Sequence, residues 1–210
     1  MFNTCARCGS YHADKTIDPA GPYAICPECG YRHPFRQLPL FVITGASGAG
    51  KSSVCTELAQ HTDDVVVMES DILWQNEYAS QGPDYRHYRE MWLRVCKNIS
   101  QAGKPVVLCG CAVPEQFEPC VERRYFGALH YLALVCDDDV LAARLKARPQ
   151  WRSSGDEENI HNHVQFNQWL KENAERTAIQ LLDTTGIGLG VTTDAVLKWI
   201  REKQTRVGQM

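Results

Sequence analysis

The sequence lacks a long hydrophobic run and a strong excess of either charge. No apolar stretch in its 210 residues approaches the roughly 20 that a membrane-spanning helix requires. The first residues, MFNTCARCGSYHADK, lack the apolar segment of a secretory signal. A formal net charge of −3 provides no global attraction to nucleic acid or to an anionic membrane. These absences predict a cytoplasmic protein without a membrane partner, and they argue against nucleic acid as a partner.

Internal repeats and low-complexity tracts are also missing, but the character of the sequence changes once. Residues 1–36 are rich in Cys, Gly, Pro, Tyr and His and show no sustained apolar periodicity. From Pro39 onward, apolar runs alternate with amphipathic stretches. We therefore predict a small module over residues 1–36 and a main domain over residues 37–210.

The apolar runs of the main domain predict strands, and the stretches between them predict helices. The predicted strands are residues 40–44, 64–69, 104–110, 130–136 and 178–183. The predicted helices are residues 52–60, 85–101, 138–148, 159–177 and 192–203. Strands that are almost continuously apolar are typical of a parallel sheet with helices on both faces. The sequence thus predicts a three-layer α/β fold with about five parallel strands.

The segment GASGAGKS (45–52) fits the phosphate-loop pattern G-x-x-x-x-G-K-[ST] at every fixed position, between an apolar run and a helical pattern. Its glycines let the backbone turn tightly and point N–H groups at phosphates. Lys51 can reach the β- and γ-phosphates, and the Ser52 hydroxyl can ligate Mg²⁺. We therefore predict ATP and Mg²⁺ as cofactors. The predicted nucleotide contacts in this loop are Gly45, Ala46, Ser47, Gly48, Ala49, Gly50, Lys51, Ser52 and Ser53.

Two carboxylates, Glu69 and Asp71, follow the second predicted strand, at the edge where open α/β sheets bind their ligands. With the phosphate loop, this element resembles small-molecule P-loop kinases such as the shikimate, gluconate and adenylyl-sulfate kinases. The resemblance extends over residues 40–204 and implies a P-loop NTPase fold. It also implies that Asp71 holds or deprotonates an acceptor hydroxyl and that Glu69 holds Mg²⁺ through water. Acids that only cap a helix are the structural alternative.

The basic segment RLKARPQWR (144–152) resembles the lid of the same kinases, which we place at about residues 144–160. The resemblance implies that Arg148 or Arg152 reaches the transferring phosphoryl group, where a guanidinium neutralises charge. Arg144 is assigned to the nucleotide, as are Asp183 and Thr184, at the end of the fifth predicted strand near the expected adenine site. A solvated basic helix end and an ordinary turn are the alternatives. Lys51, Asp71, Arg148 and Arg152 form the predicted catalytic set.

The region of about residues 72–102 corresponds to the acceptor-binding module of these kinases. Aromatic rings and arginines are interleaved there, which would suit a stacked ring with an anionic group. The predicted acceptor contacts are Asp71, Trp74, Tyr85, Arg89 and, after the third strand, Gly110. Packing of the aromatics in a core, with the arginines in solvent, is the alternative.

Cys5, Cys8, Cys26 and Cys29 form a C-x₂-C-x₁₇-C-x₂-C pattern with zinc-site spacing. Four thiolates suit tetrahedral Zn²⁺ and leave no open position, so the predicted site is a structural zinc ribbon. Two disulfides and an iron–sulfur centre are the rival interpretations. The other six cysteines are expected to be buried and free. A ribbon that supports the acceptor site, forms a homodimer or contacts nucleic acid is equally compatible with the sequence.

Together these features predict an ATP-dependent kinase that phosphorylates a hydroxyl of a small molecule, with a nucleoside-like acceptor favoured. A kinase of nucleic-acid 5′ ends, with the ribbon holding the strand, is a second hypothesis. A nucleotide-dependent regulatory protein that docks a partner through its ribbon is a third.

Overall fold

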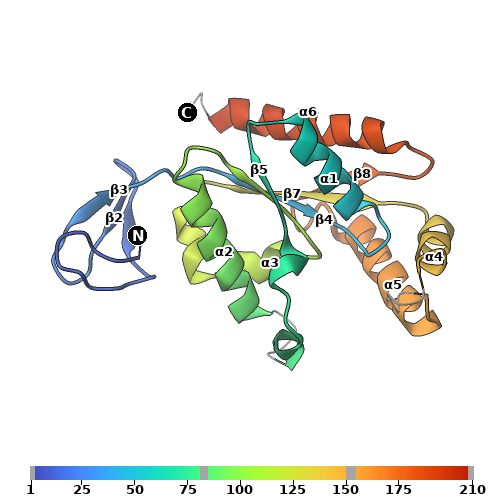
Figure 1. Cartoon of the computed structure of the whole chain (residues 1–210), viewed down its shortest axis with the longest axis horizontal. Helices are drawn as coiled ribbons and strands as arrows, with labels where there is room; N and C mark the ends of the chain where they lie inside the picture. Colours follow the sequence, from blue (N-terminus) through green and yellow to red (C-terminus); the bar gives the residue numbers. More distant parts are fainter. Residues whose placement is uncertain (1–2, 81–84, 150–154, 208–210) are drawn as a thin grey trace. The chain divides into compact units, whose positions relative to one another are not determined.

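A computed structural model describes residues 3–80, 85–149 and 155–207 (Figure 1). The chain forms two compact units, each assembled from segments that are distant in sequence. One unit comprises Phe41–Ile72, Val107–Pro114 and the chain from His130 onward. The other comprises the chain up to Leu40, Leu73–Val106 and Glu115–Leu129. The predicted boundary at residue 36 stays a prediction, because this grouping by packing does not follow it.

The first unit is built on a five-stranded sheet, as the apolar runs predict. Its strands are β4 (Leu40–Thr44), β5 (Val66–Glu69), β6 (Val106–Cys109), β7 (Leu129–Val135) and β8 (Ile179–Asp183). Their order is β5-β6-β4-β7-β8, which places β4 at the centre, and β7 and β8 pair in parallel. Every residue of β4 and β6 is buried, so the two strands read as continuous apolar runs.

Helices cover the sheet at the positions that the helical patterns predict. They are α1 (Lys51–His61), α4 (Asp138–Lys146), α5 (Glu157–Asn173) and α6 (Leu189–Val207). Helices α1 and α6 pack together on one side of the sheet, and α5 lies on the other (Figure 1). The core between these layers is apolar, with Phe41 of β4 meeting Trp199 of α6 edge to face. A three-layer α/β fold is therefore confirmed.

The second unit contains the N-terminal ribbon and the predicted acceptor helix. The ribbon has three short antiparallel strands, β1 (Thr16–Asp18), β2 (Tyr23–Ile25) and β3 (Arg32–Pro34). The rest includes α2 (Arg86–Ser100) and two 3₁₀ helices, η2 (Asn76–Ser80) and η3 (Val121–Tyr125). The 3₁₀ helix η1 (Ser70–Leu73) and the short α3 (Pro114–Phe117) each begin in one unit and end in the other.

Two of the six cysteines outside the ribbon differ from the expectation that all are free. Cys55 and Cys109 form a disulfide, with Cα atoms 6.8 Å apart. Helix α1 begins directly after the phosphate loop, and its residue Cys55 lies beside Cys109, the last residue of β6. A third, Cys111, is exposed rather than buried, because it has already left the strand. The remaining three, Cys96, Cys120 and Cys136, are buried and free as expected.

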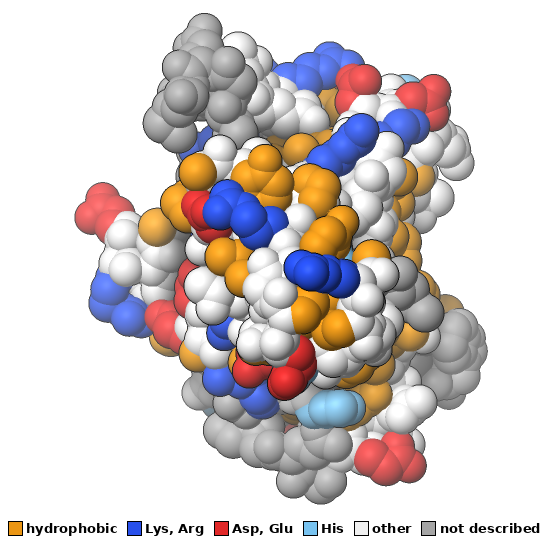
Figure 2. Space-filling model, turned by 90° about the vertical axis from the view of Figure 1, so that its left-hand side faces the viewer, with side chains coloured by type: hydrophobic (Ala, Val, Ile, Leu, Met, Phe, Trp, Pro, Cys, Tyr) orange, Lys and Arg blue, Asp and Glu red, His pale blue; other side chains and the backbone are white. Residues whose placement is uncertain are grey.

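One face of the molecule carries side chains of mixed character. On the face shown in Figure 2, Lys and Arg side chains are interspersed with acidic and apolar ones. Within the described residues, no helix is both long enough and apolar enough to span a bilayer.

Candidate active site

The phosphate loop connects β4 to α1, and its glycines have backbone conformations that other residues rarely adopt. Gly45, Gly48 and Gly50 have φ angles of 144°, 91° and 101°. A Cβ atom on Gly45 would lie 2.4 Å from the carbonyl oxygen of Leu134, so a side chain has no room there. Gly50 precedes α1 and offers no side chain to cap it. The first N–H groups of α1 are therefore available to an anion.

Cationic side chains gather on this loop. Lys51 folds back and donates through Nζ to the carbonyl oxygens of Gly45 and Ala46, at 2.8 and 3.0 Å. Arg148 donates to the Ser47 hydroxyl at 2.8 Å. Two positive groups from separate segments thus lie beside the loop that the sequence assigns to phosphates.

A cavity of about 570 Å³ opens beside the loop and brings together most of the predicted catalytic residues. It is lined by Ser47, Gly48, Gly50, Lys51, Ser52, Ser53, Glu69, Asp71, Ile72, Cys109, Gly110, Cys111 and Arg148. The Ser52 hydroxyl donates to the Glu69 carboxylate, so the two predicted Mg²⁺ ligands are neighbours. A hydroxyl and a carboxylate are the hard oxygen donors that Mg²⁺ prefers, and these residues fit that ion.

Asp71 is exposed in η1, directly after β5, and its Oδ1 accepts from the Ser70 hydroxyl at 3.3 Å. Gly110 also lines the cavity, but its own surroundings explain the glycine. A Cβ there would lie 1.9 Å from the Ser70 hydroxyl oxygen. Gly110 therefore permits a close approach to Ser70, which in turn bonds to Asp71. Contact between Gly110 and the acceptor stays a prediction.

A second cavity, of about 320 Å³, also borders the loop and has a more apolar lining. Arg144 crosses it, donating to the carbonyl and hydroxyl oxygens of Thr184 at 3.1 and 3.3 Å. Ile187 and Leu189 supply apolar surface. This combination of apolar surface and hydrogen-bonded polar groups suits a nucleotide base.

Asp183, predicted to contact the base, is placed differently from its neighbour Thr184. Its carboxylate accepts from the Thr185 N–H at 2.8 Å and closes a local turn. The hydrogen bonds from Thr185 lower the pKa of Asp183. Among the described residues, the lining of the second cavity includes Thr184 and not Asp183.

Part of the predicted lid, including Arg152, lies outside the described residues. The described part of the lid provides Arg148 just after α4, and Asp156, whose side chain caps α5 by accepting from the Asn159 N–H at 2.8 Å. The Asp156 cap therefore fixes the residue at which α5 begins.

Sequence reasoning missed His163, which α5 brings to the phosphate loop. The Ser47 N–H donates to its Nδ1 at 3.4 Å. Burial lowers the pKa of His163, and the charges of Lys51 and Arg148 lower it further. No motif surrounds this histidine, so nothing in the sequence indicates which neighbour its helix face would meet.

We expect nucleotide binding to reverse that effect. A triphosphate in the loop would oppose the two cations and raise the pKa of His163, so its binding should take up protons below about pH 6.5. Nucleotide affinity should then increase as the pH falls through that range. Calorimetry with magnesium nucleotide, in two buffers of different ionisation enthalpy, measures the uptake directly.

His163→Gln should remove this uptake, whereas His161→Gln, an exposed histidine on the same helix, should retain it. Comparing variants cancels protons that come from the nucleotide itself. Equal uptake by the parent and His163→Gln would show that the histidine does not sense the phosphates.

The predicted acceptor residues Trp74, Tyr85 and Arg89 belong to the second unit, where they form one cluster. The rings of Trp74 and Tyr85 meet edge to face, with centroids 5.6 Å apart. The Arg89 guanidinium lies 5.8 Å from the centre of the Tyr85 ring and donates to Gln116 at 2.9 Å. Trp74 is exposed, so the cluster offers an aromatic surface beside a buried arginine.

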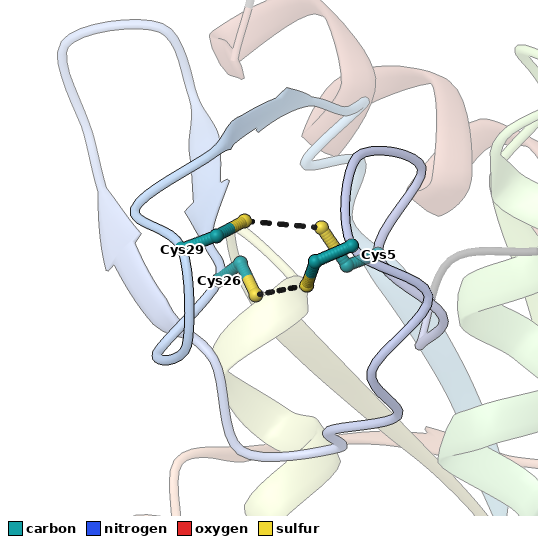
Figure 3. A group of neighbouring side chains, drawn as sticks. Cys5, Cys26 and Cys29 are labelled. Carbon is teal, nitrogen blue, oxygen red and sulfur yellow. Dashed lines mark hydrogen bonds between the residues drawn. The ribbon is translucent and has the colours of Figure 1, made fainter.

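The four ribbon cysteines converge from two loops, and Figure 3 shows the sulfurs of Cys5, Cys26 and Cys29 facing one another. All four sulfurs lie within 4.8 Å of one another, and two pairs are 3.6 and 3.8 Å apart. Sulfurs about 2.3 Å from a tetrahedral zinc ion are about 3.8 Å apart. The arrangement fits structural zinc and not the alternative of two disulfides, since all four cysteines are free.

The thiols of this group cannot all ionise together without a cation. Hydrogen bonds led by the Ser10 hydroxyl lower the pKa of Cys26 to about 6 and also lower that of Cys8. The pKa of Cys29 is instead raised, to about 12: the Tyr31 N–H lowers it, but desolvation and contact with the other thiols outweigh that effect. A divalent cation would remove this conflict, because zinc binds thiolates.

Comparisons with known proteins agree with the three-layer α/β fold and its phosphate loop. Residues 42–165 match the family model of an AAA domain, AAA_18. A sugar kinase from Janibacter sp. superposes with a TM-score of 0.60 at 15% identity, over 78% of this chain and 95% of that one. A gluconokinase from Sinorhizobium meliloti superposes with a TM-score of 0.58 at 20% identity, over 83% of this chain and 98% of that one. A tunicamycin resistance protein from Deinococcus radiodurans superposes with a TM-score of 0.57 at 16% identity, over 79% of this chain and 96% of that one. No curated protein matches the sequence.

The fold and the phosphate loop define a P-loop α/β protein, and its fold is shared with the solved sugar kinase and gluconokinase. Because the family match includes more than half of the chain, the protein belongs to the AAA domain family AAA_18.

Proposed function

We propose that this protein is an ATP-dependent phosphotransferase that moves the γ-phosphoryl group to a hydroxyl of a small molecule. The proposal is carried by the larger cavity, where Lys51, Ser52, Glu69, Asp71 and Arg148 meet. A P-loop switch protein needs the phosphate loop and its metal ligands. An exposed carboxylate in the same cavity is the additional group that a transferase needs.

Each residue has a role that follows from its charge and position. Lys51 and the N–H groups of the loop hold the phosphates, and Arg148 neutralises charge on the phosphoryl oxygens during transfer. Asp71 accepts the proton of the attacking hydroxyl. Ser52 and Glu69 would hold Mg²⁺, which supplies further neutralisation of the phosphates. Thr184, Arg144 and the apolar residues of the second cavity hold the base.

The acceptor that we favour is nucleoside-like. The cluster of Trp74, Tyr85 and Arg89 supports this, because a planar ring can stack on the indole while the guanidinium holds a polar or anionic group. Two of the structurally similar proteins are described as a sugar kinase and a gluconokinase. Sugars and sugar acids are therefore the competing class of acceptor.

The ribbon is proposed to hold a structural Zn²⁺ ion through Cys5, Cys8, Cys26 and Cys29. The ion would supply folding free energy to a module whose strands are only three residues long. Structural zinc sites contribute about 10–16 kcal/mol in small modules.

Lys51→Ala provides the first test of the proposal. Loss of a charged hydrogen-bond donor should weaken magnesium nucleotide binding by about 10- to 100-fold. Titration calorimetry measures the change, with Lys198→Ala, an exposed lysine of α6, as the control that should bind like the parent. A parent that shows no saturable nucleotide binding contradicts the proposal at its root.

A thermal-shift screen tests the acceptor class. The parent should be stabilised by an acceptor in the presence of Mg²⁺ and a non-hydrolysable ATP analogue. Nucleosides are expected to stabilise it more than sugars, gluconate or antibiotics at equal concentration. Stabilisation by gluconate or a sugar alone would replace the nucleoside assignment and retain the kinase.

A further inference from the structure

We infer that the metal ribbon braces helix α2, so that metal binding by the four cysteines controls the order of this helix. The aromatic cluster with Arg89 is attached to α2. If that cluster is the acceptor site, as the proposed function has it, zinc is required for acceptor recognition while nucleotide binding is not affected by it.

The first observation is a buried polar junction between the ribbon and α2. Lys97 of α2 is 1% exposed and donates through Nζ to the side chain of Asn3 and to the carboxylate of Glu122, at 2.5 Å each. Arg94 completes the junction by donating to Glu122 at 2.8 Å. Asn3 precedes the first metal ligand, Cys5, by two residues. A buried ammonium and carboxylate are stable only with all their partners in place, so a shift of Asn3 affects α2.

The second observation is that the ribbon's small core includes a residue from outside the ribbon. Ala24 and Phe35, with Ile17, pack against Tyr125 of η3, and the rings of Phe35 and Tyr125 meet edge to face at 5.9 Å. The Tyr125 hydroxyl donates to the Ala13 carbonyl at 2.6 Å and accepts from the Lys15 N–H at 3.2 Å. The ribbon is therefore not a self-contained module, since its core is completed by η3.

Helix α2 links this junction to the aromatic cluster. Arg89, Leu93 and Lys97 are spaced four residues apart, and all three are buried on one face of α2. Lys97 holds the end nearer the ribbon, and Arg89 carries the guanidinium of the cluster two turns away. Gln101, just after the helix, adds a further link through hydrogen bonds with the backbone of Arg36, at 2.9 and 3.1 Å.

These contacts couple metal binding to the position of α2. Without metal, the loop that carries Cys5 loses the shared ligation that would tie it to Cys26 and Cys29. Asn3, Ala13 and Lys15 lie on the same stretch of chain and are all partners of α2 or η3. Loss of the metal should therefore release the helix. The phosphate loop belongs to the other unit.

Hydrogen exchange of the full chain, zinc-loaded and treated with a chelator in the same reducing buffer, tests the inference. Backbone amides of α2 and η3 should exchange at least tenfold faster without zinc, and amides of α1 and α6 should be unchanged. The affinity for a magnesium ATP analogue, by calorimetry, should change less than twofold. Unchanged exchange in α2, with a fully exchanging ribbon, would overturn the inference.

Nucleotide binding provides a second way to contradict the inference. If zinc removal also abolished nucleotide binding, the metal would stabilise the whole chain and the specific link to α2 would be wrong. If zinc-loaded protein also failed to bind nucleotide, the proposed function would fail, and the exchange result for α2 would still decide the inference.

A matched pair of variants tests the reverse direction of the coupling. Tyr125→Phe keeps the ring and removes two hydrogen bonds to the ribbon, so it should weaken zinc binding at least threefold in competition with a chelating dye. It should also speed exchange in α2. Tyr131→Phe makes the same chemical change in buried strand β7 and should leave zinc affinity unchanged. Equal zinc affinity in both variants would refute the coupling.

Discussion

Replacing Asp71 with asparagine should reduce phosphoryl transfer by about 10²- to 10⁴-fold while leaving nucleotide affinity unchanged. The asparagine keeps the size of the side chain and can still accept from Ser70, but it cannot take the proton of an attacking hydroxyl. The loss should therefore appear in kcat. Steady-state kinetics with the acceptor found by thermal shift, and calorimetry with magnesium nucleotide, separate the two quantities.

Asp183→Asn is the matched control for this experiment. Asp183 ends β8, at the opposite edge of the same sheet, and its carboxylate accepts a hydrogen bond from the Thr185 N–H. Its replacement should leave kcat within a few-fold of the parent. Transfer by Asp71→Asn at the parental rate would remove Asp71 from the mechanism and return it to the role of a helix-capping acid.

Arg148→Ala should lower kcat by about 10³-fold or more. Arg148 reaches the phosphate loop through Ser47, and its guanidinium stabilises negative charge that increases in the transition state. Because this interaction strengthens during transfer, the effect should fall on kcat more than on KM for nucleotide.

Arg144→Ala should affect KM for nucleotide more than kcat, which is the opposite of the effect expected for Arg148→Ala. Arg144 is tied to Thr184 in the second cavity, so its loss should raise KM for nucleotide and change kcat little. Similar kinetic effects for both variants would show that the two arginines act on the same part of the nucleotide. The proposed separation of base and phosphoryl contacts would then be wrong.

The fold was predictable because its signals are local. The strands of the sheet are short apolar runs, of which β4 and β6 are buried along their whole length. The segments between the strands have the apolar spacing or the capping residues of helices. The phosphate loop was predictable for the same reason, since glycine at positions 45, 48 and 50 satisfies a backbone requirement that neighbours cannot change. The convergence of the ribbon cysteines follows likewise from their spacing.

Features that depend on packing between distant segments could not be predicted. The periodicity of α2 identifies an apolar face but gives no reason to bury Lys97, whose partners Asn3 and Glu122 are 94 and 25 residues away. His163 lies 116 residues from Ser47 in sequence. The disulfide between Cys55 and Cys109 depends in the same way on how α1 packs against β6.

The close approach of Gly110 to Ser70 has an evolutionary consequence. A methyl group at position 110 would displace the hydroxyl that bonds to Asp71, so the two positions should drift together among relatives. Lineages that acquire alanine at 110 should carry glycine at 70, because the Cβ of residue 70 would also lie only 2.8 Å from the new methyl group. In such lineages the carboxylate would lose a neighbour that restricts its rotation, which would suit a wider range of acceptor shapes.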